Sequence, residues 1–135
     1  MRKIEEIIVH CTATPRGRKV TAADVDRWHR ERGFECIGYH YIVRLDGQIE
    51  AGRPENRVGA HCIGHNRCSI GVCYAGGCEA DMTPADTRTP AQRESLRRLL
   101  RELKSRYPEA KIHSHRDFAA KACPSFDATK EYRDL

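Results

Sequence analysis

Short apolar runs alternate along the chain with two capped helices, and this alternation constrains the fold more than any other feature. The segment KIEEIIVHC predicts a mostly buried strand whose apolar run ends at His10. The segment SIGVCYAGG predicts a central strand whose glycines admit a close backbone approach. Strands interleaved with helices predict an α/β fold with a central mixed β-sheet flanked by helices. Because the chain has 135 residues, we expect residues 1–135 to form a single domain.

Both helices have recognisable ends. The first begins with a capping box at Thr21 and stops at Gly33. The second begins at Thr89, with Pro90 at the first helical position, and ends before Pro108. Its buried face consists of leucines with helical spacing.

The remaining elements are short. The segment YHYIVRLDGQIEAG predicts a β-hairpin with Asp46-Gly47 as its two-residue turn. The segment DMTPADTRTP is rich in turn residues and is expected to be irregular. The segment AKIHS predicts a strand that delivers His113 and His115 to its end.

The composition narrows the classes of partner. The chain has 24 Lys and Arg against 19 Asp and Glu, a net charge of +5, which suits an anionic partner such as nucleic acid or a bacterial cell wall. The arginines between positions 93 and 106 have helical spacing, and a solvated helix face explains them equally well. We therefore expect no specific nucleic-acid binding and a monomeric protein.

The apolar runs are far shorter than the roughly 20 residues that span a bilayer, so we expect no membrane insertion. The beginning MRKIEE lacks the apolar stretch of a signal peptide, which predicts synthesis in the cytoplasm. The seven cysteines are odd in number and predict reduced thiols. Cys68, Cys73 and Cys78 recur every five residues, but odd separations place successive strand residues on opposite faces, which argues against a second metal cluster.

The polar segment IHSHRDFAAKACPSFD has too many reactive side chains for an ordinary loop. A catalytic zinc ion takes three protein ligands and keeps one position for water. His115 and Cys123 supply two suitable groups, and His10, the first polar residue after a buried strand, supplies a third. A histidine at a strand end is more often a hydrogen-bonded core or surface group, and a cysteine is more often buried than ligating. The spacing alone leaves these alternatives open.

Five segments occur in one order along nearly the whole chain: VHCTAT, GYHYIVRLDGQIEAGR, VGAHCIGHNRCSIGVCYAGG, TPAQRESLRRLL and HRDFAAKACPSFD. In this the chain resembles the type 2 N-acetylmuramoyl-L-alanine amidases, a zinc amidase group that includes small phage endolysins and animal peptidoglycan recognition proteins. The resemblance implies one Zn²⁺ per chain at one rim of the sheet, bound by His10, His115 and Cys123. It also implies that Tyr39 and Lys121 form the catalytic pair.

The resemblance further implies that His61 lines the substrate groove, and Asn66 in the same loop is a candidate donor to stem-peptide carbonyls. His29 and His113 are interpreted as structural, with His113 a candidate partner of a metal ligand. Asp117 is expected to cap a turn and not to bind metal.

The implied reaction is zinc-dependent hydrolysis of the amide between the lactyl group of N-acetylmuramic acid and the L-alanine of the stem peptide. The protein would then act on the cell wall after release or export. No HExxH motif is present, so a helix-borne glutamate base is absent. Lys121 can donate to the tetrahedral oxyanion, whereas Tyr39 can orient or deprotonate water or donate to the oxyanion. The alternative is a non-catalytic peptidoglycan-binding module, but such binders lack the cysteine that stands here as Cys123.

Overall fold

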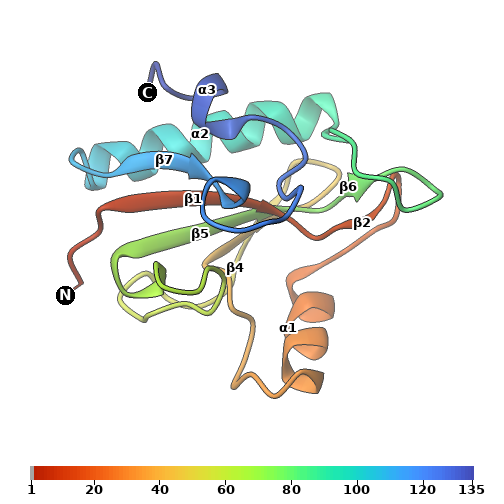
Figure 1. The fold of residues 1–135 in the computed structure, drawn as a ribbon, viewed down its shortest axis with the longest axis horizontal. Coiled ribbons are helices and arrows are strands. Elements are labelled where there is room, and N and C mark those ends of the chain that lie inside the picture. The colour runs from red at the N-terminus through yellow and green to blue at the C-terminus, as the bar shows by residue number, and fades with distance from the viewer. Residues whose placement is uncertain (1) are drawn as a thin grey trace.

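A five-stranded mixed sheet forms the centre of the molecule, with strand order β4-β3-β5-β1-β7 (Figure 1). The computed structural model describes residues 2–135. The strands are β1 (Glu6–Cys11), β3 (Tyr41–Val43), β4 (Ile49–Ala51), β5 (Ser69–Tyr74) and β7 (Lys111–Ser114). Four of them run parallel, and only β4 pairs antiparallel, with β3. The predicted α/β class with a mixed sheet is confirmed.

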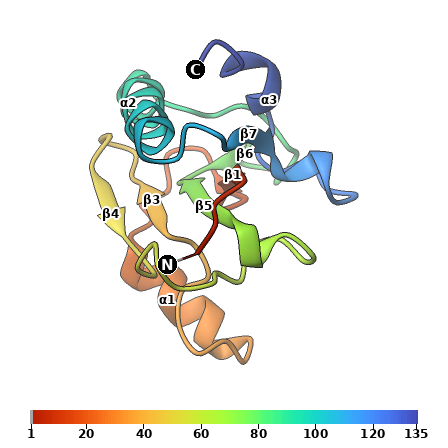
Figure 2. The ribbon, with the colours of Figure 1, turned by 90° about the vertical axis from the view of Figure 1, so that its left-hand side faces the viewer.

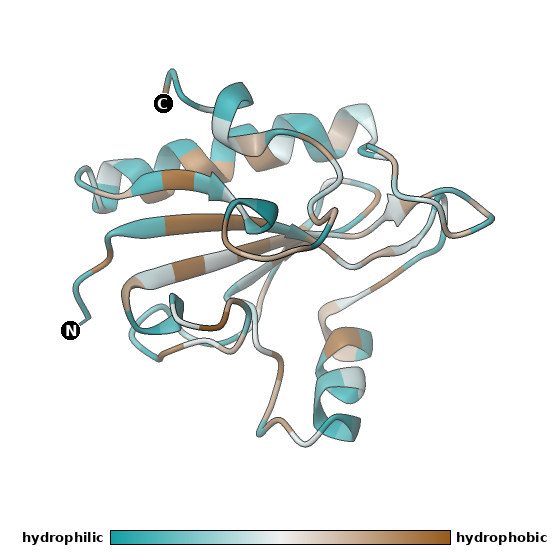
Figure 3. Ribbon diagram, in the orientation of Figure 1, coloured by the Kyte–Doolittle hydropathy of each residue, from teal (hydrophilic) through white to brown (hydrophobic). Residues whose placement is uncertain are grey.

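Helices cover both faces of this sheet. The long helix α2 (Pro90–Arg106) and the short helix α3 (Ala128–Glu131) lie on one side, and α1 (Ala22–Glu31) lies on the other (Figures 1 and 2). Figure 3 shows the apolar residues concentrated in the middle of β1 and β5. Because side chains alternate along a strand, Ile7 and Val9 pack with the leucines of α2, whereas His10 faces the side of α1.

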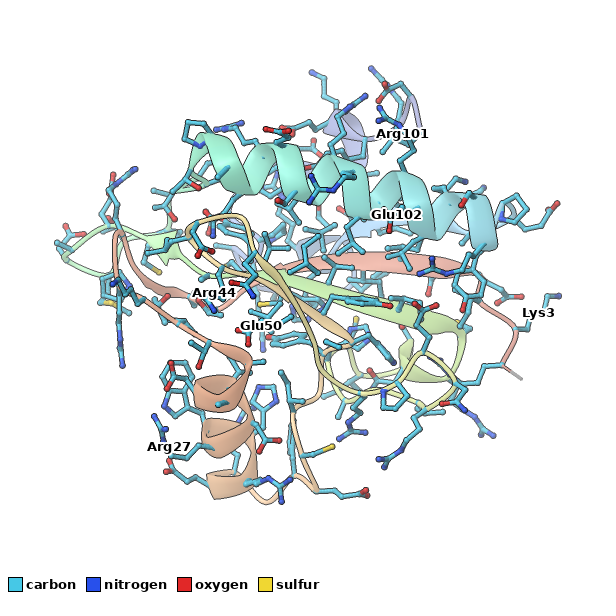
Figure 4. All side chains as sticks on the ribbon, turned by 180° about the vertical axis from the view of Figure 1, so that it is seen from behind. Lys3, Arg27, Arg44, Glu50, Arg101 and Glu102 are labelled. Atoms are coloured by element: carbon cyan, nitrogen blue, oxygen red, sulfur yellow. The ribbon has the colours of Figure 1, made fainter. Side chains whose placement is uncertain are left out.

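The helix starts were predicted correctly because their signals are local. Thr21 Oγ1 accepts the N–H of Asp24 at 3.2 Å, and Asp24 Oδ2 accepts the N–H of Thr21 at 3.0 Å. The same reciprocal pair joins Thr89 and Gln92 at the start of α2. The N–H of Ala22 also donates to Glu50 Oε1 on β4 at 3.0 Å, which ties α1 to the sheet (Figure 4).

The hairpin is present, but its predicted turn is wrong. Arg44 and Gln48 are joined by a backbone hydrogen bond of 2.9 Å, and the N–H of Gly47 donates to the oxygen of Arg44 at 2.9 Å. The loop therefore has three residues, 45–47. Gly47 has φ 86°, the left-handed conformation that closes a loop of this length.

Several short elements have no clear signal in the sequence. β2 (Thr14–Pro15) and β6 (Gly77–Cys78) form a second, two-stranded sheet. The short helices η1 (Asn66–Cys68) and η2 (His115–Asp117) precede β5 and follow β7. These elements matter because η1 and η2 border the candidate site.

The charged residues of α2 lie on its solvated face, where Arg101 and Glu102 are exposed (Figure 4). Arg93 and Arg97 pair with Asp86 and Asp134. Within residues 2–135, no helix has both the length and the apolar character needed to cross a membrane.

Candidate metal centre and cleft

Three side chains with metal-ligand chemistry meet beside the ends of two neighbouring strands. His10 lies near the end of β1, His115 begins η2 directly after β7, and Cys123 lies in the following loop. Because β1 and β7 are parallel neighbours, their ends meet at the same edge of the sheet. The three ligand atoms lie within 4.8 Å of one another, and no other group of three His, Cys, Asp or Glu of this kind occurs in residues 2–135.

Both histidines are held in the neutral form that binds metal. Burial lowers the pKa of His10 well below its usual value, and the neighbouring His61 and His115 add to this effect. Burial and the ammonium of Lys121 lower the pKa of His115. Each imidazole therefore keeps a lone pair at neutral pH.

The thiol of Cys123 has a donor beside it, because the N–H of Cys11 lies 3.2 Å from its Sγ. The neighbouring thiol of Cys11 and burial raise the pKa of Cys123, although the N–H of Cys11 acts in the opposite direction. A divalent cation opposes this increase in pKa, since coordination deprotonates a thiol. Two neutral imidazoles and one cysteine sulfur form a donor set typical of zinc, and their convergence on one point fits that ion.

A cleft of about 400 Å³ opens beside this group. Five of the seven predicted site residues line it: Tyr39, His61, Asn66, His115 and Lys121. The other two, His10 and Cys123, lie behind the lining within reach of His115. The structure therefore brings all seven together around one cavity.

The two residues of the expected catalytic pair differ in their surroundings. Tyr39 packs against the rings of His10 and His29, with centroid distances of 5.0 and 5.4 Å. Burial raises the pKa of Tyr39 well above its usual value, so its phenol is a hydrogen-bond donor at neutral pH. Lys121 is exposed on the cleft wall.

His61 and Asn66 both line the cleft, and both also have partners inside the protein. The Nδ1 of His61 lies 2.8 Å from Nε2 of His10, and its Nε2 lies 3.2 Å from Ser69 Oγ. Asn66 Oδ1 accepts the backbone N–H groups of His61 and Cys62, both at 2.9 Å. The amide nitrogen of Asn66 is therefore the atom of that side chain that can donate a hydrogen bond to a ligand.

The sequence did not reveal the apolar wall of the cleft. Phe34, Ile63 and Phe118 line it, and Ile63 is 97% exposed. The ring of Phe118 stacks on His65 at 3.9 Å and meets His113 at 4.9 Å. The only available signal was the position of Phe118 between two expected ligands.

The structure also shows the contacts of three further residues to which the sequence analysis gave roles. His29 makes a structural contact, because its Nδ1 accepts the N–H of Gly38 at 2.8 Å, and it also lines the cleft. Asp117 caps its own turn by accepting the N–H of Ser114 at 3.3 Å. His113 lies 3.6 Å from a carboxylate oxygen of Asp117 and 4.0 Å from one of Glu6.

Comparison with known proteins decides the family. The family model described as N-acetylmuramoyl-L-alanine amidase matches residues 1–126. The chain belongs to this amidase family. The resemblance seen in the sequence is thereby confirmed.

The relatives of this amidase include phage lysins. It is 46% identical over 126 residues to the endolysin of Klebsiella phage KP32, covering 93% of this chain and 83% of the relative. It is 46% identical over 124 residues to the endolysin of Escherichia phage T7, covering 91% and 82%.

Among solved structures, the amidase LysC from Clostridium intestinale superposes with a TM-score of 0.83 at 32% identity, covering 96% of this chain and 82% of that one. Drosophila PGRP-LB superposes with a TM-score of 0.81 at 23% identity, covering 97% and 80%, which shows a shared fold. These comparisons identify the protein as an enzyme of the N-acetylmuramoyl-L-alanine amidase class.

Proposed function

We propose that this amidase is a zinc enzyme that hydrolyses the amide between the lactyl group of N-acetylmuramic acid and the L-alanine of the stem peptide. The observation that carries the proposal is the His10, His115 and Cys123 group beside a cleft lined by Tyr39 and Lys121. Family membership and the endolysin relatives support the choice of peptidoglycan as substrate.

His10, His115 and Cys123 would hold one zinc ion per chain. When bound, zinc supplies Lewis acidity toward the substrate carbonyl and makes water a better nucleophile. Zinc bound by three protein ligands would keep one position for water, and the cleft lies beside His115, which is both a ligand candidate and a lining residue. The cysteine that non-catalytic binders lack is present as Cys123, which favours an enzyme.

Two side chains beside this site have distinct proposed tasks. The ammonium of Lys121 donates to the oxygen that becomes negative as the tetrahedral intermediate forms. The phenol of Tyr39, which is protonated at neutral pH, donates a hydrogen bond that orients water or the reacting carbonyl. His61 and Asn66 border the substrate, and Asn66 offers its amide N–H₂ to peptide carbonyls.

The charge of the cleft supports an anionic substrate. Among residues 2–135, the lining of the cleft includes Arg32 and Lys121 and no carboxylate. Stem peptides carry free carboxyl groups, so an anionic peptide lies in a favourable field. We propose that a single domain of residues 1–135 performs the reaction as a monomer and acts on the cell wall after release or export.

Digestion of purified sacculi tests this function. Mass spectrometry of the soluble fraction should find intact stem peptides with a new free amino group on L-alanine. The glycan strands should stay polymeric, because glycoside hydrolysis needs a pair of carboxyl groups, and no carboxyl group of the described residues lines this cleft. A chelator should abolish the release, and added zinc should restore it. New reducing sugar ends, or peptides cut between amino acids, would refute the assignment.

A further inference from the structure

We propose that His61 is a positioning residue for the metal ligand His10, acting through a hydrogen bond that selects which nitrogen of His10 faces the metal. The inference rests on the proposed zinc site. It goes beyond the groove-lining role that the family resemblance implies for His61.

A chain of hydrogen bonds carries the proposal. His10 Nε2 lies 2.8 Å from His61 Nδ1, and His61 Nε2 lies 3.2 Å from Ser69 Oγ. Since Nε2 of His10 is occupied by this bond, Nδ1 is the nitrogen left for a metal. A metal on Nδ1 requires the proton of His10 to be on Nε2, so His10 donates, His61 accepts, and His61 in turn donates to Ser69.

The fold holds the ring of His61 from two sides. A Cβ atom at Gly71 would lie 2.7 Å from Cγ and Cδ2 of His61, and one at Gly59 would lie 2.8 Å from Cδ2. Only the absence of both side chains leaves room for the ring. Asn66 Oδ1 fixes the backbone of the same residue by accepting its N–H at 2.9 Å.

This arrangement differs from that of a residue placed to bind substrate. Both ring nitrogens of His61 already have protein partners, so a hydrogen bond to substrate would break one of them. The ring meets that of His10 edge-on, with a centroid distance of 4.8 Å and an angle of 88°. A partner in this position fixes both the orientation and the tautomer of a ligating histidine.

Zinc affinity, measured by competition with a chromophoric chelator, tests the role without reference to turnover. His61→Phe keeps a ring of similar size and removes the acceptor, and we expect its zinc Kd to rise about 10–100-fold. His61→Asn places an amide oxygen near the position of Nδ1 and should restore most of the affinity. Ile63→Ala changes an exposed cleft residue of the same loop and should keep the zinc Kd of the wild type while changing KM.

The ¹⁵N chemical shifts of the zinc-loaded wild type give a readout that needs no variant. We expect His10 and His61 both to carry their proton on Nε2. A His61→Phe protein that folds and binds zinc like the wild type would overturn the inference, as would a proton on Nδ1 of His10. If the wild type binds no zinc, the proposed zinc chemistry fails as well, whereas zinc binding unaffected by His61→Phe refutes the positioning role alone.

Discussion

Acid should destabilise the metal-free protein through His40, a residue outside the metal centre. Its side chain is fully buried, its Nδ1 accepts the N–H of Gly71 at 3.0 Å, and its Nε2 donates to the carbonyl of Arg57 at 2.8 Å. A proton on Nδ1 would point at the N–H of Gly71 and would place a second cation 3.2 Å from the guanidinium of Arg2. Burial, reinforced by Arg2, accordingly lowers the pKa of His40.

The sign and size of the effect follow from linkage. The unfolded chain binds a proton at His40 near pH 6.5, whereas the folded chain binds it only at a lower pH, so the free energy of unfolding falls as the pH falls below about 6.5. One proton contributes at most about 1.4 kcal/mol per pH unit, so the loss that His40 causes between pH 8 and pH 5 is at most about 2 kcal/mol. Above about pH 7.5 the contribution is constant.

Urea denaturation of the chelator-treated wild type and of His40→Asn, at pH 8 and at pH 5, measures this difference. Asn keeps an acceptor for the N–H of Gly71 but does not titrate. The wild type should lose more stability than His40→Asn between the two pH values, by at most about 2 kcal/mol, with unchanged m-values. Because the other histidines are common to both proteins, they cancel in the comparison. Equal losses in the two proteins would refute the role given to His40.

Four further substitutions test the site. Elemental analysis should find about one zinc ion per chain in the wild type and much less in Cys123→Ala, and undiminished zinc in that variant would remove Cys123 from the ligand set. Lys121→Ala and Tyr39→Phe should both keep the zinc and the fold. The kcat of Lys121→Ala should fall by about 10²–10³-fold. A metal-free or unfolded Lys121→Ala protein would show that this lysine is structural. Gly71→Ala should lower the free energy of unfolding, measured by urea titration, by about 1–3 kcal/mol, because the Cβ of the alanine would meet the ring of His61. A variant as stable as the wild type would contradict that contact.

Features set by neighbouring residues were predictable from the sequence. The capping boxes at Thr21 and Thr89 involve residues three apart, and both helices begin where these signals lie. The hairpin was also predicted, but the length of its loop was not. Asp-Gly suits both two- and three-residue loops, and the register of β3 on β4 selects between them.

The residues that form the site were predictable in part, from the order of the sequence motifs that contain them. The contacts between these residues were not predictable, because they join segments that are far apart in the sequence. His10 and His61 are 51 residues apart, and no local pattern signals the hydrogen bond between them. The apolar wall at Phe118 likewise depends on how η2 packs beside η1, where Phe118 stacks on His65.

The glycine within β5 shows how the sheet and the site constrain each other. A glycine inside a strand weakens that strand. A glycine in a buried central strand therefore often marks a place where another group approaches the backbone closely. Gly71 pairs with Ile8 in the parallel register, and His10, two residues after Ile8, faces the same side of the sheet. The missing side chain of Gly71 leaves the space in which the ring of His61 reaches His10. The sequence predicted a close backbone approach at this glycine, but the group that approaches it is a side chain, the ring of His61, which in the proposed zinc site is the partner of the ligand candidate His10.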